Sequence, residues 1–382
     1  MPGRQYGGKV IINAGSFTME KRTLHFGFGV DANYVKYAGV LMTNLVVLHP
    51  DRPLYFHLAC DGIEAADRQK LKALVHKYNN VRVDVYDLRR QLDALKSISS
   101  KVPARLNRSM LLRILLPAVV PQQVRRLVYL DVDVICINRL DELFRLALQG
   151  QAIGAVRDTK SAENAAALGL TGSEYFFSGV LVIDVPVWHS LQLTERVAAY
   201  YQQNSEKLLL ADQDALNAVI DGSFTELDKR YNFLIEVNNP LMCAYPANAA
   251  ILHCVNETKA WTQGCLKSIR ELYWRYVRQS PWHDLQPSEP ATVKAAFLAA
   301  TTAELEGEHE QARRYYVVVI NRFTEYYYNK APQLLQAAQQ ECLAAAAAEK
   351  QGEAVLAVRC YGLAARRLME QYLRENPEFV KN

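Results

Sequence analysis

Cysteine pairs, long apolar runs and a strong net charge are all missing from this sequence. Its seven cysteines include no Cys-x-x-Cys pair, and an odd number does not suit a disulfide framework. We therefore expect reduced, mostly buried thiols. No stretch approaches the roughly 18 uninterrupted apolar residues of a membrane-spanning helix. The formal net charge of +4 over 382 residues does not by itself indicate a nucleic-acid partner, and we expect none.

The N-terminal residues do not resemble a targeting segment. Their apolar run covers only residues 10–14, which is shorter than the core of a signal peptide, about 7–15 residues. We expect a cytoplasmic protein, with peripheral contact to a membrane as an open alternative.

The composition is that of a globular protein, with 50% hydrophobic and 22% charged residues. The length fits two or three domains, or one large domain with an appendage. We expect an N-terminal extension at 1–23, an α/β domain at 24–285 and a helical domain at 286–382. The last boundary follows a Pro-rich segment at 281–290, beyond which the chain is rich in Ala, Glu, Arg and Tyr.

The first 130 residues alternate between strand-like and helix-like patterns. Strands are predicted at 24–29, 54–60, 81–86 and 127–130, and helices at 37–47, 64–78 and 108–116. This alternation is typical of an α/β fold with a largely parallel sheet. Ligands of such sheets bind beyond the carboxyl ends of the strands, where Asp31 and Asp131 are placed.

The pattern after residue 290 is helical only. Two helix–Gly–helix units are predicted, at 291–323 around Gly307 and at 332–373 around Gly352. The two glycines are 45 positions apart, which suggests a helical repeat.

The strongest chemical motif is Asp131-Val132-Asp133, directly after the apolar strand. On an extended chain, residues i and i+2 point the same way, so both carboxylates would project toward one point. Two carboxylates without a counter-charge are unfavourable at neutral pH, and a divalent cation such as Mg²⁺ or Mn²⁺ would remove the conflict. The alternative is a solvated turn or a helix cap.

Two other polar segments are candidates for chemistry. His253 follows an apolar run, and an imidazole can complete an oxygen-rich Mn²⁺ site, while Lys259 is placed to reach a phosphate. The alternative for His253 is a structural role. Asp212 and Gln213 precede a helical pattern, in which Asp212 has the alternative role of a helix N-cap.

A fourth segment, 175–184, is an apolar strand entered through Ser178-Gly179. A glycine at this place lets a backbone approach a ligand closely. Core packing is the alternative.

Together and in this order, these segments resemble the family-8 retaining glycosyltransferases, and within them the bacterial lipopolysaccharide α-glucosyl- and α-galactosyltransferases. The resemblance extends over about residues 24–282. It is carried by the segments FGVDANY (28–34), LLRILLP (111–117), LVYLDVDVI (127–135), SGVLVID (178–184), ADQDALN (211–217) and HCVNETKAW (253–261).

The resemblance implies a GT-A fold with a Rossmann-like mixed sheet, a UDP-sugar donor, and Mn²⁺ or Mg²⁺. By position, Asp131, Asp133 and His253 would bind the metal, and Asp212 and Gln213 would lie beside the transferred sugar. The expected donor-binding set is Gly29, Val30, Asp31, Asn33, Tyr34, Arg113, Asp131, Val132, Asp133, Asn256 and Lys259. Within it, Asp31, Asn33 and Tyr34 would contact uracil and ribose, Arg113 would reach the donor and Lys259 its phosphate.

Three positions depart from the family pattern. Phe177 stands where the family usually has Asn, so a polar contact to a sugar is lost unless Ser178 replaces it. Asn256-Glu257 stands where Gly-Pro is usual, and Ala260 where Pro is usual. These changes affect the expected donor contacts and leave the expected fold intact.

The implied reaction transfers a glucose or galactose from UDP to a hydroxyl of the lipopolysaccharide core, forming an α-linkage. The transition state should be oxocarbenium-like. Because the amide of Gln213 is a poor nucleophile, we favour attack by the acceptor hydroxyl on the face that UDP leaves, with a phosphate oxygen taking the proton. A family-8 transferase acting on another glycan or a protein, and a degenerate transferase serving as a scaffold, are the alternatives.

The segment 267–282 interleaves basic and aromatic residues. A helix of this kind suits an anionic membrane surface, which for a lipopolysaccharide acceptor would be the cytoplasmic face of the inner membrane. The alternative is a packed linker helix with a solvated basic face. Its basic residues are Lys267, Arg270, Arg275 and Arg278, and its aromatic residues are Tyr273, Trp274, Tyr276 and Trp282. The oligomeric state is left open.

Overall fold

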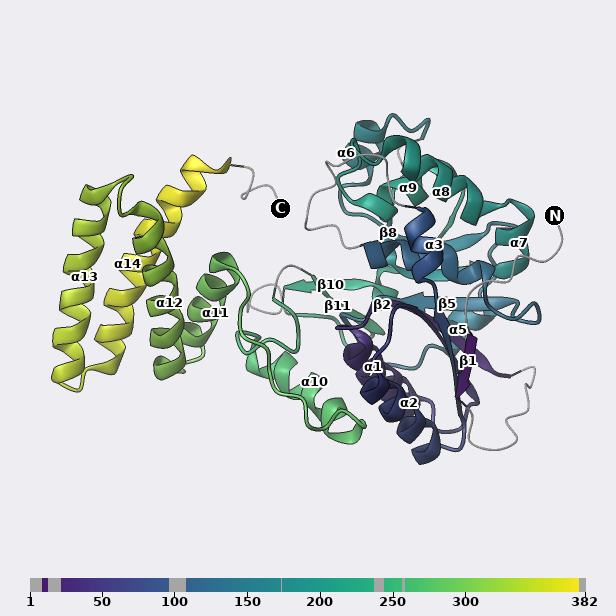
Figure 1. Cartoon of the computed structure of the whole chain (residues 1–382), viewed down its shortest axis with the longest axis horizontal. Coiled ribbons are helices and arrows are strands. Elements are labelled where there is room, and N and C mark those ends of the chain that lie inside the picture. The colour runs from purple at the N-terminus through teal and green to yellow at the C-terminus, as the bar shows by residue number, and fades with distance from the viewer. Residues whose placement is uncertain are drawn as a thin grey trace. The chain divides into compact units, whose positions relative to one another are not determined.

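The computed structural model describes residues 9–12, 22–95, 108–172, 174–236, 244–255 and 258–377. The chain divides into two compact units, which are described separately (Figure 1). The first unit consists of Met1–Leu234, Tyr245–His253 and Tyr276–Leu285, and the second of Ile235–Ala244, Cys254–Arg275 and Gln286–Asn382. The domain boundary expected near residue 285 stays a prediction.

The first unit is built on an eight-stranded mixed sheet. In spatial order its strands are β1 (Lys9–Ile12), β4 (Val81–Asp87), β3 (Leu54–Asp61), β2 (Leu24–Asp31), β5 (Arg126–Leu130), β8 (Phe176–Asp184), β7 (Ile153–Arg157) and β9 (Thr225–Glu226). Strands β4, β3, β2 and β5 are parallel, whereas β1 and β8 are antiparallel to their neighbours. The predicted strands and the predicted α/β class are confirmed.

Helices cover both faces of this sheet, as Figure 1 shows for α1 and α2 on one side and α8 and α9 on the other. Apolar side chains from the sheet and from α4, α7, α8 and α9 form one buried cluster that includes Leu116, Ile183 and Trp188. The helices of this unit begin with α1 (Val35–Leu48), α2 (Ala65–Lys77), α3 (Arg89–Ala94), α4 (Leu112–Leu115) and α5 (Asp141–Arg145), and continue with α6 (Ser161–Leu168), α7 (Val185–Ser190), α8 (Leu193–Asn204) and α9 (Ala211–Ile220).

The helix expected at 108–116 is shorter than predicted. Only α4 is α-helical, and it is flanked by 3₁₀ turns at Arg108–Leu111 and Leu116–Ala118. Pro117 has no backbone N–H with which to continue an α-helix.

A second, three-stranded sheet contains β10 (Phe233–Glu236), β11 (Ile251–Val255) and β6 (Val134–Cys136). Strand β11 is antiparallel to β6, and its register sets His253 opposite Val134. The chain passes from the large sheet to the small one between Leu130 and Val134.

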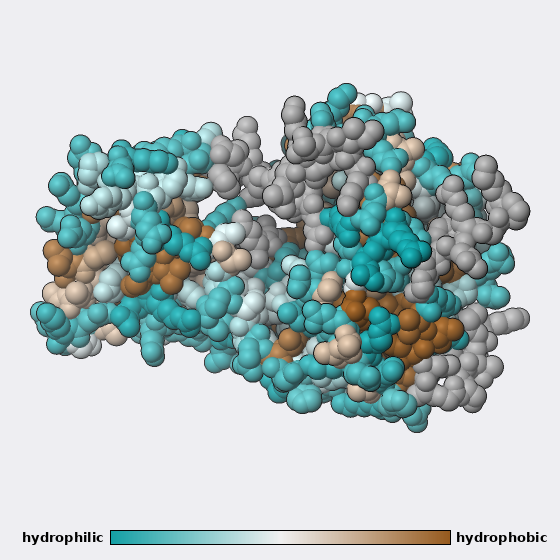
Figure 2. Space-filling model, in the orientation of Figure 1, coloured by the Kyte–Doolittle hydropathy of each residue, from teal (hydrophilic) through white to brown (hydrophobic). Residues whose placement is uncertain are grey.

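The second unit contains two helix pairs, α11 (Val293–Leu305) with α12 (His309–Tyr327) and α13 (Pro332–Lys350) with α14 (Ala354–Glu375). Gly307 and Gly352 lie between the paired helices and have φ angles of 75° and 77°, which glycine adopts without steric cost. Aromatic side chains of α12 such as Tyr316 and Phe323 fill the core. The predicted helix–Gly–helix units are confirmed, and Figure 2 shows apolar residues gathered on one face of these helices.

Helix α10 (Lys267–Gln279) and the residues directly after it carry the aromatic side chains that were expected to face a membrane. Tyr273, Tyr276 and Trp282 are buried. The Trp282 indole N–H donates to Asp67 Oδ1 at 2.7 Å, and its ring packs so closely on Gly39 that a Cβ there would lie 2.1 Å away. These three side chains serve packing, Trp274 is half-buried, and the membrane contact of this segment stays a prediction.

Two expectations drawn from the composition can be compared with the described residues. Of the cysteines among them, all are free and four are buried, as predicted. No helix in the described ranges has both the length and the apolar character needed to cross a bilayer.

A buried polar network crosses the parallel part of the sheet. The ring nitrogens of His25 on β2 and His57 on β3 are 3.1 Å apart, and His57 also contacts the Tyr86 hydroxyl at 3.0 Å. Tyr55 and Tyr86 donate to Asp84, a fully buried carboxylate that pairs with Lys9. Burial, aided by the charge of Arg82, lowers the pKa of His25 to about 4, and burial lowers the pKa of His57 well below its usual value.

This network predicts a loss of stability in mild acid. His25 takes up a proton near pH 6.5 in the unfolded chain but near pH 4 in the folded chain, so the free energy of unfolding falls as pH drops through that window. Between pH 7 and pH 5 the loss from His25 is on the order of 2 kcal/mol. Urea unfolding of the His25→Gln variant should show a correspondingly smaller loss between these two pH values.

The exposed His76 gives the matched control. The His76→Gln variant should lose as much stability between pH 7 and pH 5 as the parent protein. An equal acid dependence in the parent and in His25→Gln would contradict the assignment.

Candidate active site

The Asp131–Asp133 segment lies where the chain leaves the large sheet and enters the small one. It forms a turn between β5 and β6, and the Asp131 N–H donates to the Gly179 carbonyl of β8 at 2.8 Å. The expectation of an extended chain is therefore wrong. Strand pairing between β11 and β6 brings His253 to the same place, so residues 120 positions apart meet at the carboxyl edge of β5.

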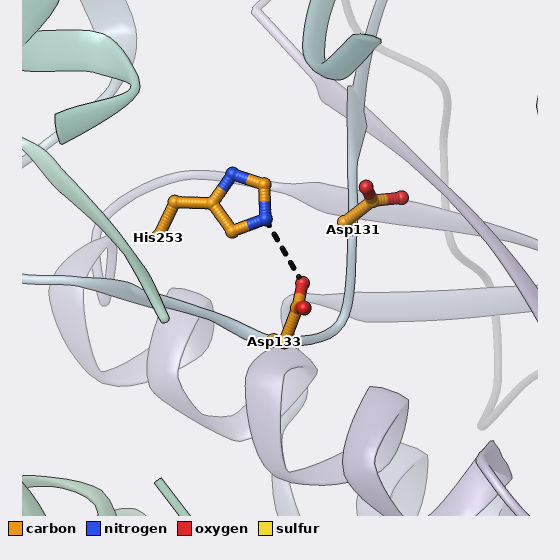
Figure 3. A group of neighbouring side chains, drawn as sticks. All are labelled: Asp131, Asp133 and His253. Carbon is orange, nitrogen blue, oxygen red and sulfur yellow. Dashed lines mark ion pairs between the residues drawn. The ribbon is translucent and has the colours of Figure 1, made fainter. Parts of the chain in front are cut away.

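Asp131, Asp133 and His253 each contribute one ligand atom to a group whose atoms all lie within 4.8 Å of one another. His253 Nε2 is 3.3 Å from Asp133 Oδ1, and Figure 3 shows the imidazole reaching toward this carboxylate from its strand. Two carboxylates and an imidazole at this separation suit Mn²⁺ or Mg²⁺. The structure thus brings together all three residues expected to bind the metal.

Asn232 orients the histidine. Its Oδ1 lies 2.9 Å from His253 Nδ1, and because an amide oxygen only accepts, Nδ1 carries the proton. Nε2, which lies beside Asp133, is then the nitrogen that would bind a metal. Sequence reasoning missed Asn232, because nothing in its local pattern distinguishes it.

Gly179 provides the space that this arrangement needs. A Cβ at this position would lie 2.5 Å from His253 Cε1 and 2.9 Å from Asp131 Oδ2. The sequence predicted a close backbone approach at Gly179 to a ligand. The structure shows that the close approach is to two of the metal-site side chains themselves.

Arg113 supplies the counter-charge that the sequence did not reveal. Its Nη2 donates to Asp131 Oδ1 at 2.9 Å, its Nη1 donates to Ser178 Oγ at 2.6 Å, and its Nε lies 2.6 Å from Asp212 Oδ2. The guanidinium is almost fully buried and lies over the ring of Tyr129. The expectation that the Asp131–Asp133 pair lacks an internal counter-charge is therefore wrong for Asp131.

The pKa values of this cluster depend on burial and on charge. Burial raises the pKa of Asp212 to about 6, with Arg113 opposing the shift and Asp131 adding to it. Burial also raises the pKa of Asp131, against the effect of Arg113. Burial alone would lower the pKa of Arg113, but the two carboxylates hold it above its usual value.

Asp212 and Gln213 lie in the first turn of α9 and face β8. The N-cap position is Leu210, and Asp212 is buried against Arg113, so the capping alternative is wrong. Gln213 Oε1 accepts from the Ser178 N–H at 3.0 Å, and its Nε2 donates to the Tyr175 hydroxyl at 3.3 Å. Ser178 thus links Arg113 to Gln213.

The expected donor-binding residues of β2 lie at the same edge of the sheet, because β2 and β5 are parallel neighbours. Asp31 Oδ1 accepts from the N–H groups of Asn33 and Tyr34 at 2.9 and 3.1 Å, which fixes the turn into α1. Gly29 lies against Leu112 and Tyr129, and Val30 is buried.

Two other expected residues are not placed at this site. Lys259 belongs to the second unit, and its Nζ donates to the Cys254 carbonyl at 3.1 Å. Asn256 lies outside the described residues.

Tyr129 was also missed by sequence reasoning. Its hydroxyl donates to Asp131 Oδ1 at 3.1 Å. A signal was present in the sequence, since Tyr129 lies in the apolar strand and precedes Asp131, the first residue after it, by two positions.

Comparisons with known proteins identify the family of this chain. The sequence model of Glycosyl transferase family 8 matches residues 25–265, more than half of the chain. The chain is 26% identical to a lipopolysaccharide 1,2-glucosyltransferase of Escherichia coli K12 over 282 residues, covering 71% of this chain and 82% of that protein. It is 23% identical to a lipopolysaccharide 1,3-galactosyltransferase of Salmonella typhimurium LT2, covering 80% and 91%.

The fold is similar to solved glycosyltransferase structures. The galactosyltransferase LgtC in complex with donor and acceptor sugar analogs superposes with a TM-score of 0.54 at 22% identity, covering 65% of this chain and 95% of that one. An active-site mutant of LgtC gives a TM-score of 0.57 at 21% identity, with coverages of 67% and 96%. The mixed sheet is thus that of the GT-A fold, as predicted.

The Gly179→Ala variant tests the packing of the metal site. The added methyl group collides with His253 and Asp131, so we expect Mn²⁺ affinity, measured by calorimetry, to fall at least about tenfold, the range seen when a metal ligand loses its orientation. The circular dichroism spectrum should not change.

Gly172→Ala is the control, because a Cβ there meets nothing closer than 3.9 Å. Its Mn²⁺ affinity should equal that of the parent. If Gly179→Ala also bound Mn²⁺ with parental affinity, the role given to Gly179 would be wrong.

Proposed function

The chain belongs to glycosyltransferase family 8, and we propose that it transfers a hexose, glucose or galactose, from a UDP-sugar to a hydroxyl of a lipopolysaccharide core oligosaccharide. The observation that carries the proposal is the convergence of Asp131, Asp133 and His253 at the carboxyl edge of the sheet. The names of the two bacterial relatives support this acceptor class and leave both hexoses open. The proposed product is an α-linkage formed with retention of configuration.

The three side chains would hold Mn²⁺ or Mg²⁺. Bound there, a divalent ion supplies positive charge that stabilises the diphosphate leaving group. The surrounding residues keep the ligands in place: Asn232 fixes the tautomer of His253, and Tyr129 and Arg113 hold Asp131. Because all three groups of its guanidinium are engaged, we assign Arg113 a positioning role as well as its expected contact with the donor.

The donor nucleoside would bind at the end of β2. Asp31, Asn33 and Tyr34 are the proposed contacts for uracil and ribose, with the backbone of Gly29, Val30 and Val132 close by along the strand ends. Tyr34 exposes 40% of its surface, which leaves ring area for a base to stack on. Lys259 and Asn256 are the proposed contacts for the donor phosphates.

Retention is best explained by attack of the acceptor hydroxyl on the face that UDP leaves. Asp212 has 1% of its side chain exposed and is paired with Arg113 at 2.6 Å, so it is poorly placed to attack the sugar as a nucleophile. Gln213 is half-buried and held by Ser178 and Tyr175. Its amide oxygen would stabilise positive charge at the sugar, and a phosphate oxygen of the leaving UDP would take the acceptor proton.

The double variant Asp131→Asn with Asp133→Asn tests the proposed function. Both side chains keep their size while the metal site loses two negative charges. Transfer from UDP-glucose or UDP-galactose to deep-truncation lipopolysaccharide, followed by mass spectrometry with Mn²⁺ present, should fall at least about a hundredfold, because losing several kcal/mol of charge stabilisation costs about tenfold per 1.4 kcal/mol.

Asp93→Asn with Asp228→Asn is the control, since it removes two exposed carboxylates of the same unit. This control should transfer at the parental rate. Mn²⁺-dependent transfer that survives in the first double variant would refute the metal assignment. A glycosyl adduct trapped on Asp212 would refute front-face attack, and UDP-sugar hydrolysis without transfer to any core acceptor would refute the acceptor class.

A further inference from the structure

A large hollow lies at the opposite edge of the sheet from the proposed active site. Its volume is about 1040 Å³, and it opens where β2 begins at Leu24 and β5 begins at Arg126. The two sites are far apart, because an eight-residue strand such as β2 spans roughly 26 Å. Six of its lining residues are charged, and we call the site that they form the arginine hollow: Arg22, Arg52, Arg125, Arg126, Arg145 and Asp141.

The single carboxylate of the arginine hollow is already compensated. Asp141 Oδ1 lies 3.1 Å from Arg52 Nη1, and Asp141 Oδ2 lies 2.9 Å from Nε of Arg139, a residue outside the hollow. Among the described residues, Arg22, Arg125 and Arg145 make no ion pair, and Arg126 has only Asp184 at 4.0 Å. The arginine hollow therefore concentrates positive charge that the described part of the chain does not neutralise.

Two guanidinium groups of the arginine hollow also have N–H groups without a hydrogen-bond acceptor among the described residues. Within the described ranges, Arg52 Nε and Arg126 Nη1 are shielded from solvent and make no hydrogen bond. A shielded donor without an acceptor costs free energy. Burial lowers the pKa of Arg126, which means that its surroundings disfavour the charged form. An anion in the arginine hollow would accept hydrogen bonds from these donors and would stabilise the charged form of Arg126.

A neighbouring hollow allows the pairing of arginines to be compared on this part of the surface. Its two additional arginines are both paired, Arg139 with Asp51 at 2.6 Å and Arg230 with Glu142. Arg52 and Arg145 line both hollows, whereas Arg22 and Arg125, which make no ion pair with described residues, line only the arginine hollow, whose volume is large enough for a small ligand.

We propose that the arginine hollow binds a ligand that carries clustered phosphate groups, at a site separate from the UDP-sugar site. Guanidinium groups match phosphate oxygens in planar, paired hydrogen bonds. Five arginines facing one hollow call for several negative charges in a small volume, which a diphosphate or neighbouring phosphates supply and a single carboxylate does not. Such phosphates can belong to a soluble metabolite or to the headgroup of an anionic lipid. The proposal goes beyond the transferase reaction and does not depend on it.

Calorimetry with inorganic pyrophosphate in EDTA tests the soluble source, since the proposed donor site lacks its metal under these conditions. Hydrogen exchange with the same ligand should show protection at residues 22–26, 122–127 and 141–146. Co-sedimentation with phosphatidylglycerol vesicles, compared with phosphatidylcholine vesicles, tests the headgroup source.

The variant Arg125→Gln with Arg145→Gln removes two exposed members of the arginine hollow that make no ion pair with the described residues. It should weaken pyrophosphate or phosphatidylglycerol binding at least tenfold and leave transfer of the sugar unchanged. Arg196→Gln with Arg359→Gln, two exposed arginines elsewhere, removes the same charge and should leave binding unchanged.

The outcomes separate clearly. Pyrophosphate binding that the first double variant weakens supports a soluble ligand, and vesicle binding alone with the same dependence supports a headgroup. Binding of neither probe, equal weakening by both double variants, or exchange protection confined to residues 131–133 would overturn the proposal.

Discussion

The first unit depends on one electrostatic constraint, the approach of two carboxylates where the chain passes from the large sheet to the small one. Asp131 and Asp133 are held close by a turn, and like charges at that separation repel each other. Arg113 offsets the first carboxylate from α4, and His253 faces the second from β11. The remaining parts of the site serve this arrangement: Gly179 makes room, Asn232 sets the imidazole and Tyr129 donates to Asp131. A metal ion would complete the charge balance that Arg113 begins.

Much of the fold and part of the site could be predicted from the sequence because they depend on local patterns. Period-2 strands, helix periodicity and the glycines at 307 and 352 are local, and the strands and helix pairs they predicted are present. The prediction that Asp131, Asp133 and His253 share one metal site depended on the ordered resemblance to a family. The contacts that could not be predicted from the sequence are long-range. Asn232 contacts His253 across 21 positions, and Arg113 contacts Asp212 across nearly a hundred. The burial of Trp282 also depends on Gly39 and Asp67, which are distant in the sequence, so the local pattern of basic and aromatic residues could not reveal it.

The small net charge of the chain conceals a separation of charge along the strands. Carboxylates gather at the carboxyl edge of the parallel strands, and unpaired arginines gather at the amino edge. Between the two edges, the buried network of His25, His57 and Asp84 is polar but largely uncharged at its histidines, because burial keeps their pKa values low. A single sheet thus separates an acidic site that suits a cation from a basic site that suits an anion. The net charge of +4 is a sum over the whole chain and therefore reveals neither site.

The central claim is that His253 and the two aspartates form one metal site. Electron spin-echo spectroscopy of the protein with one equivalent of Mn²⁺ tests it most directly, because a coordinated imidazole couples a ¹⁴N nucleus to the manganese spin. The account predicts this coupling in the parent protein and its loss in His253→Ala, with Mn²⁺ still bound more weakly by Asp131 and Asp133. Mn²⁺ bound without nitrogen coupling in the parent, or with coupling that survives in His253→Ala, would contradict it.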